Sequence, residues 1–407
     1  MFTYVDNERA AKIKVIGVGG AGGNAINNMI RSGLHGVTFI AANTDAQALE
    51  ISQADTRIQL GDGITEGLGA GANPQIGREA ALESADELRA ALSGSHMVFI
   101  TAGLGGGTGT GATPVIAEIC REMGALTVAV VSRPFSFEGK KRGLIAEQGL
   151  SELKQVVDTA ITIPNDRLRA LASKKATLME MFLKADEILL HAVKGITDLI
   201  MMPGLVNLDF ADVRTTMSKA GMALMGVGIA SGENRAIEAA EKAISHPLLE
   251  DISISGARGV LMNITASSAM EFEEVAEASE RIHKEVGDEA EIFWGTSVDE
   301  SLGDEMRVTV IATGIGAEAE AARPAERERE KAKEAERRVV QPLRGKVRDV
   351  TPEDMARQDI VDLDEPAFIR QRRAVGESSG AIYRGVGRMA LDDGDLDVPT
   401  FLRRKAD

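Results

Sequence analysis

The sequence predicts an α/β protein built on a doubly wound parallel sheet, followed by a long central helix, a second and smaller αβ domain, and a disordered charged tail. Three observations predict this arrangement. Apolar, β-branched runs alternate with helical segments over residues 11–175. Apolar residues then recur at helical spacing over 176–202, and the composition becomes strongly charged after Gly316. Strands that alternate with helices favour a parallel sheet with helices on both faces.

Residues 11–175 form the first predicted domain, after a flexible N-terminus of residues 1–10. Helices are expected over Arg78–Leu92 and from Pro114 to Met123. The predicted strands are Lys12–Val18, Val37–Ala42, Met97–Ala102 and Leu126–Val131. Their β-branched and aliphatic residues are typical of strands buried on both faces.

The second predicted domain, residues 203–316, follows the long helix, which Pro203-Gly204 ends. Strands are expected near Gly259–Ile264, Ala290–Trp294 and Met306–Ala312. Residues 317–393 are rich in Glu, Arg, Ala, Asp and Lys, and the stretch Glu318–Arg338 could form a charged helix but has no apolar stripe, which predicts a disordered linker. Apolar residues return in a terminal peptide, 394–407.

Charge and composition restrict the class of protein. The net charge of −16 argues against a chain that coats nucleic acid or an anionic membrane. The single cysteine, Cys120, cannot form an internal disulfide. There is no secretory leader and no apolar run of the roughly 18–20 residues that span a bilayer, so we expect a cytoplasmic protein without membrane insertion. The five histidines show no metal-ligand spacing, so no protein-held metal site is predicted.

Two glycine-rich turns suggest a phosphate site. Residues 17–24 read GVGGAGGN after a predicted strand, which matches the dinucleotide fingerprint; a flexible strand-to-helix turn is the alternative. The lysine-containing phosphate loop GxxxxGK[ST] is absent. Residues 105–111 read GGGTGTG between a strand and the predicted Pro114 helix. Backbone amides and hydroxyls with so little side-chain bulk suit a loop wrapped around nucleotide phosphates better than a linker.

With this second loop, the sequence resembles the tubulin/FtsZ family of GTPases. The loop has the form of the tubulin signature, and further segments match the family in order over residues 11–316. These segments are Asn43–Leu49 (NTDAQAL), Gly69–Pro74 (GAGANP), Pro134–Gly139 (PFSFEG) and Pro164–Leu168 (PNDRL). The last dozen residues also resemble the family's terminal peptide.

The resemblance implies GTP and GDP as ligands, with Mg²⁺ held mainly through the phosphates and K⁺ as a further candidate cation. The implied nucleotide-binding residues are Gly19, Gly20, Ala21, Gly22, Gly23, Asn24, Thr44, Gly103, Gly106, Gly107, Thr108, Gly109, Thr110, Glu138, Arg142, Asn165, Phe182 and Asp186. Among them, Glu138 and Arg142 would contact the ribose or α-phosphate, and Phe182 would stack on the base. The Asp186 carboxylate suits guanine, because it can accept from both donors of the Watson–Crick edge.

The resemblance also implies that catalysis is shared between subunits. Asp209 and Asp212, supported by Asn207, would enter the nucleotide site of the next subunit and polarise the attacking water. Their three-residue spacing at a helix start can place both carboxylates on one face, although acidic residues there also suit the helix dipole. Assembly would then be a head-to-tail homopolymer, with hydrolysis dependent on it.

The tail contains two copies of one pattern, LDxPxF[IL]R, at residues 363–370 and, 33 residues further on, 396–403. By the resemblance, the terminal copy binds membrane tethers and division regulators through Leu396, Asp397, Pro399, Phe401, Leu402 and Arg403. We expect the upstream copy to be a second docking motif.

These expectations describe a GTPase that forms filaments of the cytokinetic ring, in the cytoplasm at midcell. Two alternatives stay open: a dinucleotide-dependent oxidoreductase built on the Gly17–Gly22 turn, and a filament-forming paralogue with a role outside division. The oxidoreductase leaves the second glycine loop and the Asn207–Asp212 segment unexplained.

Overall fold

The computed structural model describes residues 11–170, 175–202, 206, 208–218, 222–249, 254, 256–287 and 290–315. These residues build one mixed sheet with the strand order β3-β2-β1-β4-β5-β6-β7-β10-β8-β9. The first six strands of this order pair in parallel, which confirms the predicted doubly wound sheet. The predicted tail, 317–407, and the N-terminal residues 1–10 lie outside the described residues.

The parallel half has six strands: β1 Ile13–Val18, β2 Val37–Asn43, β3 Thr56–Gln59, β4 Met97–Gly103, β5 Leu126–Arg133 and β6 Thr159–Pro164. Its α-helices are α1 Gly19–Arg31, α2 Ala46–Glu50, α3 Asp62–Thr65, α4 Pro74–Glu83, α5 Ala85–Leu92, α6 Thr108–Glu122 and α7 Lys140–Leu153. Two short 3₁₀ helices, η2 Ser136–Glu138 and η3 Asn165–Ala170, follow β5 and β6. The four predicted strands agree with β1, β2, β4 and β5 to within two residues, whereas β3 and β6 were not predicted.

The two faces of the parallel strands pack into separate aliphatic cores, as the alternation of side chains along a strand requires. On one face, residues such as Val15 and Val128 pack with α1 and the long helix α8, Leu178–Met201. On the other face, residues such as Ile16 and Ala129 pack with α4, α5, α6 and α7. The first core also contains β7, β8 and β10 residues, so it joins the two halves of the described chain.

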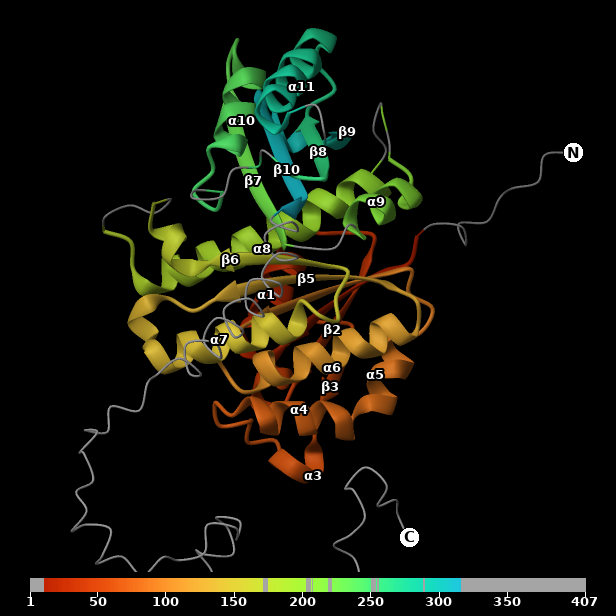
Figure 1. The fold of residues 1–407 in the computed structure, drawn as a ribbon, viewed down its shortest axis with the longest axis vertical. Helices are drawn as coiled ribbons and strands as arrows, with labels where there is room; N and C mark the ends of the chain where they lie inside the picture. The colour runs from red at the N-terminus through yellow and green to blue at the C-terminus, as the bar shows by residue number, and fades with distance from the viewer. Residues whose placement is uncertain are drawn as a thin grey trace, which may run out of the picture. The chain divides into compact units, whose positions relative to one another are not determined.

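The second half confirms the predicted smaller αβ domain. Its elements are α9 Phe210–Met217, β7 Met222–Ser231, α10 Arg235–Ile244, β8 Gly259–Ala266, α11 Phe272–Val286, β9 Glu291–Val298, η4 Glu300–Leu302 and β10 Glu305–Ile315. Strand β10 pairs antiparallel with both β7 and β8. Figure 1 shows α8 between the parallel half and the part that carries α10 and α11. Helix α8 starts with a capping box formed by Thr177 and Glu180.

Two predicted helices differ from the observed ones. The segment Arg78–Leu92 is two helices, α4 and α5, separated at Ser84, whose hydroxyl accepts from Gly61 N–H and donates to the Gln59 carbonyl. Helix α6 starts at Thr108 rather than Pro114, so the proline lies inside it. The end of the predicted glycine loop is therefore the first turn of α6.

Candidate functional site

The two glycine-rich turns lie side by side at the carboxyl ends of the paired strands β1 and β4. Helix α1 begins at Gly19 and α6 at Thr108, and no side chain caps the first N–H groups of either helix. The two starts are close, because a Cβ atom built on Gly19 would lie 3.1 Å from the Gly109 amide nitrogen. Two adjacent uncapped helix N-termini form a site for an anion such as phosphate.

The glycines of these turns serve two different needs. A Cβ atom on Gly20, Gly23 or Gly106 would meet no atom within 4 Å, so these residues leave open space in front of the backbone. By contrast, a Cβ atom on Gly22 would lie 2.5 Å from the Thr101 carbonyl oxygen, so close packing requires glycine there. One set thus leaves room for a ligand, and the other fixes the loop that would hold it.

Hydroxyl groups connect the loops. The Oγ1 atoms of Thr44, which follows β2, and Thr108 lie 2.6 Å apart and share a hydrogen bond. The Thr110 Oγ1 accepts from the Gly105 N–H at 2.8 Å, so this hydroxyl closes its own loop. A third segment, 69–73, packs against the second glycine loop, since a Cβ atom on Gly107 would lie 2.9 Å from the Asn73 nitrogen.

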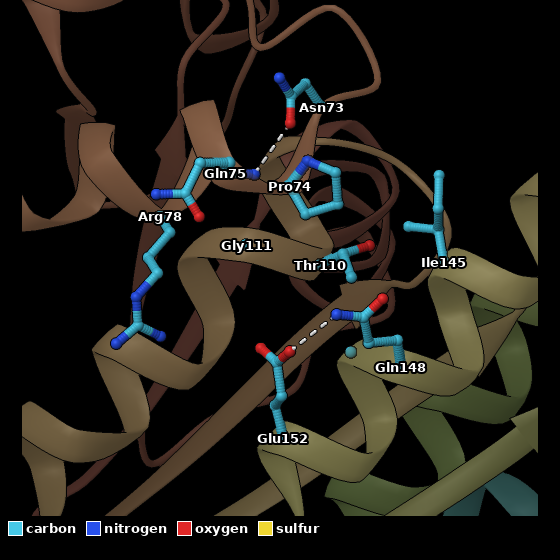
Figure 2. Close-up of a pocket in the computed structure, with 10 residues that line it drawn as sticks. Asn73, Pro74, Gln75, Arg78, Thr110, Gly111, Ile145, Gln148 and Glu152 are labelled. Atoms are coloured by element: carbon cyan, nitrogen blue, oxygen red, sulfur yellow. Dashed lines mark hydrogen bonds between the residues drawn. The ribbon is translucent and has the colours of Figure 1, made fainter. Parts of the chain in front are cut away.

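A cavity of about 250 Å³ lies behind this loop, between α4, α6 and α7 (Figure 2). The helices pack closely around α6: Cβ atoms on Gly111 and Gly149 would lie 1.9 Å from the Pro74 carbonyl oxygen and 2.2 Å from the Thr110 methyl group. The start of α6 is therefore braced by α4 and α7. The lining residues are Asn73, Pro74, Gln75, Arg78, Thr110, Gly111, Ile145, Gln148, Gly149 and Glu152.

The residues expected at the ribose form an ion pair with each other. Arg142 Nε lies 3.2 Å from Glu138 Oε2, while Glu138 Oε1 accepts from the Phe135 N–H at 2.8 Å. A Cβ atom on Gly105 would lie 2.8 Å from the Arg142 side chain, so Arg142 lies against the second glycine-rich loop. Glu138 Oε1 thus holds the Phe135–Glu138 turn. Glu138 Oε2 contacts Arg142, and a ligand hydroxyl that replaced Arg142 would donate to the same oxygen.

Asp166 is a residue of this region that the sequence analysis missed. Its carboxylate accepts from the Ser136 N–H at 3.0 and 3.1 Å and from the Ser136 hydroxyl at 3.1 Å. These bonds join η3, which starts with Asn165, to η2, which ends with Glu138. The sequence did carry a signal for Asp166, because this acidic residue directly follows Asn165, a predicted nucleotide-binding residue, in the PNDRL segment.

The residues expected at the base come from three elements, α8, α1 and η3. Helix α8, with Phe182 and Asp186, packs against α1, which carries Asn24, and against η3. Asn165 is buried, and its Oδ1 has no hydrogen-bond partner in the described structure, as expected for an atom that awaits a ligand. Burial raises the pKa of Asp186 to about 7. The exposed Phe182 ring lies edge-on to Phe135, with centroids 5.6 Å apart.

The expected catalytic carboxylates do not approach these loops. Asp209 is the N-cap of α9, where its Oδ1 accepts from the Asp212 N–H at 2.9 Å. Helix α9 contacts the amino ends of the parallel strands: Phe210 lies beside His96, just before β4. The two glycine-rich turns follow the carboxyl ends of β1 and β4. Asn207 lies outside the described residues.

The fold and this anion site define a nucleotide-binding protein with the strand order β3-β2-β1-β4-β5-β6, in which ligands bind where the order reverses. Residues 12–173 match the GTPase domain of the Tubulin/FtsZ family, and residues 221–316 match the C-terminal domain of the FtsZ family. The chain belongs to the FtsZ family. It is accordingly a GTPase and a cytoskeletal protein of cell division.

Individual relatives agree with this assignment. The cell division protein FtsZ of Pseudomonas putida is 49% identical over the full length of both chains. That of Buchnera aphidicola is 56% identical over 78% of this chain and 83% of its own. A solved FtsZ dimer of M. jannaschii superposes with a TM-score of 0.73 at 46% identity, covering 76% of this chain and 89% of the other.

The oxidoreductase alternative is not favoured. The dinucleotide fingerprint calls for a free acidic residue at the end of the second strand, to bind ribose. Here β2 ends at Asn43, and the nearby Asp45 caps α2 by accepting from the Gln47 and Ala48 N–H groups.

Within the described residues, no group of three or more acidic, histidine or cysteine side chains is placed to hold a metal ion. None of the described helices is long and apolar enough to cross a membrane.

Proposed function

We propose that this GTPase assembles head to tail, and that GTP bound at the β1 and β4 loops of one subunit is hydrolysed with Asp209 and Asp212 of the next. One observation carries the proposal: the carboxylates lie beyond the amino ends of strands whose carboxyl ends carry the phosphate loops. Neither face is a complete site alone. A contact between unlike faces completes it and propagates as an open filament.

Each part of the proposed nucleotide site has a role that fits its position. The uncapped starts of α1 and α6 bind the phosphates, and Glu138 and Arg142 exchange their mutual contact for the ribose and α-phosphate. Asn24, Asn165 and Asp186 recognise guanine beside Phe182. Mg²⁺, held mainly by the phosphates near Thr44 and Thr108, would neutralise charge on the transferred group, and K⁺ is a further candidate.

In the next subunit, Asp212 orients and polarises the attacking water. Asp209 fixes the start of α9 and adds a second carboxylate, with Asn207 as a supporting polar contact. Phosphoryl transfer needs such positioning more than covalent chemistry.

The rim of the nucleotide site supports a subunit contact there. Several large apolar side chains near the carboxyl ends of the strands are exposed, as expected for a surface that a partner covers. These are Leu68, Phe137, Leu178, Met179, Phe182 and Leu183.

The test combines light scattering with phosphate release over a range of protein concentrations, in GTP with Mg²⁺ and in GDP. We expect GTP-dependent scattering and hydrolysis that appears only above a threshold concentration. Asp212→Ala should bind GTP normally and fail to hydrolyse it. Release strictly proportional to protein from the lowest concentration would instead mean a self-contained site and overturn the proposal.

For the tail, we propose that residues 396–403 bind membrane tethers and regulators at midcell, and that residues 363–370 are a second copy raising avidity for a clustered tether. Both copies lie outside the described residues and rest on the sequence. A linker over 317–393 would have a coil reach of roughly 50 Å. Deleting 363–370 should weaken binding to a tether-coated surface, and unchanged binding would contradict the second copy.

A further inference from the structure

Helix α9, with Asp209 at its N-cap and Asp212 in its first turn, contacts the amino ends of β4, β5 and β6 and also strand β10 of its own subunit. We infer that Arg214, together with the Phe210–His96 contact, positions Asp212 for the next subunit's nucleotide. Through β4 and β5, these contacts also link the helix to the subunit's own nucleotide loops. This inference rests on the function proposed above.

Two side chains of α9 contact the GTPase domain, Phe210 at the helix start and Arg214 in its last turn. Arg214 Nη2 donates to the Gly124 carbonyl at 3.2 Å, and Gly124 lies just before β5. The Phe210 ring lies 6.1 Å from the His96 ring, centroid to centroid, at an angle of 51°. His96 is itself fixed, because its Nδ1 accepts from the Lys12 N–H at 2.9 Å. Asp212 thus lies in the chain between two residues that contact the GTPase domain, Phe210 and Arg214.

The last turn of α9 is fixed by both halves of the chain. The Thr159 hydroxyl, at the start of β6, donates to the Met217 carbonyl, and the Thr313 hydroxyl of β10 donates to the Thr216 carbonyl at 3.1 Å. Val213 and Met217 are fully buried in the core that contains the β4 and β5 residues Met97 and Leu126. With the backbone of this turn fixed, the Phe210 and Arg214 contacts set the direction in which Asp212 points.

The strands that hold α9 also lead to the nucleotide loops. Strand β4 ends at Gly103 before the second glycine loop, β5 ends at Arg133 before the Glu138 turn, and β6 ends at Pro164 before Asn165. A strand of seven residues such as β4 spans roughly 23 Å and cannot shorten without losing its ladder. The three strands therefore join the α9 contacts and the nucleotide loops within one ladder of paired strands.

Arg214 is the informative residue because it is exposed. A single hydrogen bond from an exposed side chain contributes little to folding. Its loss should therefore change where α9 lies more than whether the protein folds. A misplacement of about 1 Å in a catalytic group can reduce a rate about 100-fold, so a small shift of Asp212 is measurable.

The experiment compares Arg214→Ala and Arg214→Lys in the full chain, measuring GTP affinity, assembly threshold, and kcat and KM above the threshold. We expect Arg214→Ala to lower kcat roughly tenfold or more with GTP affinity unchanged, and Arg214→Lys to recover part of the loss. Lys242→Ala is the matched control, because Lys242 is also exposed and donates to a backbone carbonyl, that of Ile229, at 3.1 Å. Phe210→Leu, which keeps an apolar side chain but removes the ring contact, should act like Arg214→Ala.

An unchanged kcat in both Arg214→Ala and Phe210→Leu would overturn the inference, as would equal losses of kcat, GTP affinity and thermal stability. Asp212→Ala, measured in parallel, separates the two proposals. If Asp212→Ala loses hydrolysis while the positioning variants do not, only the inference fails. If Asp212→Ala hydrolyses normally, the shared active site itself fails.

Discussion

The hydroxyl groups of Thr44 and Thr108 are hydrogen-bonded at 2.6 Å across the carboxyl end of β1. Thr44 is completely buried and follows β2, whereas Thr108 is the first residue of α6. The pair therefore fixes the start of α6, whose first N–H groups no side chain caps, to the neighbouring loop.

Removing the Thr44 hydroxyl should weaken GTP binding. A typical hydrogen bond contributes about 0.5–1.5 kcal/mol, so we expect Thr44→Ala to lower GTP affinity by roughly two- to tenfold. Thr44→Ser keeps the hydroxyl and should bind almost as tightly as the natural protein. Titration with a fluorescent GTP analogue measures both affinities. Equal affinities for Thr44→Ala and Thr44→Ser would contradict a role for the hydroxyl.

GTP binding should weaken below neutral pH through Asp186. Burial raises the pKa of its carboxyl to about 7, and only the ionised form can accept both guanine donors. If binding requires that form, the apparent affinity scales with its population and falls roughly tenfold from pH 8 to pH 6. In the ligand-free protein the sign is opposite: this carboxyl stabilises the fold at low pH, and the contribution is lost as pH rises through about 7.

Asp186→Asn provides the control for this pH dependence. Its GTP affinity should be low and should keep only the pH dependence of the nucleotide's own phosphates. Binding titrations of both proteins between pH 6 and pH 8 give the comparison. Parallel pH profiles would show that Asp186 is not the titrating group.

Asp209 and Asp212 should separate into a structural and a chemical role. Asp209 caps α9, so Asp209→Ala should lower the free energy of unfolding by about 1 kcal/mol, while Asp209→Asn keeps the cap. The Asp212 side chain caps nothing in the described structure, so Asp212→Asn should unfold like the natural protein. It should nevertheless lose roughly 10²–10⁴-fold in kcat. Urea unfolding and phosphate release together test this division, and a stability loss in Asp212→Asn would argue against it.

Parts of the fold were predictable because their residues carry a local pattern. Strand β4 is buried along almost its whole length, and the sequence shows it as the apolar run Met97–Ile100 followed by Thr101 and Ala102. Strand β3, Thr56–Gln59, has only four residues and one buried side chain, so no run marks it. The break between α4 and α5 depends on bonds from Ser84 to Gln59 and Gly61, which are distant in sequence and left no local signal.

The candidate site shows the same limit. The glycine loops were recognisable because both the residue types and their order are unusual, and the structure brings the loops together. The start of α6 at Thr108 was not recognisable from the sequence, because Thr and Gly are poor helix formers and Pro114 suggested a helix start there. Close packing on the Pro74 carbonyl explains why a glycine occupies position 111. The bonds of Asp166 to Ser136 join segments 30 residues apart, beyond the reach of any local pattern.

Two glycines of α7 should respond in opposite ways to the same substitution. A Cβ atom on Gly149 would lie 2.2 Å from the Thr110 methyl group, whereas one on Gly143 would meet nothing within 4 Å. Thr110 cannot easily move, because it is buried and its hydroxyl accepts from the Gly105 N–H. Gly149→Ala should therefore lower the free energy of unfolding by roughly 1–3 kcal/mol. Gly143→Ala, at an open helical position, should raise it by roughly 0.5–1 kcal/mol.

The same pair tests whether the packing behind the phosphate loop matters for nucleotide binding. If α7 braces the loop through Thr110, Gly149→Ala should also weaken GTP affinity at temperatures where the variant is still folded, and Gly143→Ala should not. Urea unfolding and GTP titration at one temperature measure both effects. A Gly149→Ala protein that is less stable yet binds GTP normally would mean that the α7 contact supports the fold but not the loop. The bond between Thr110 and Gly105 would then be enough to hold the loop in its binding geometry.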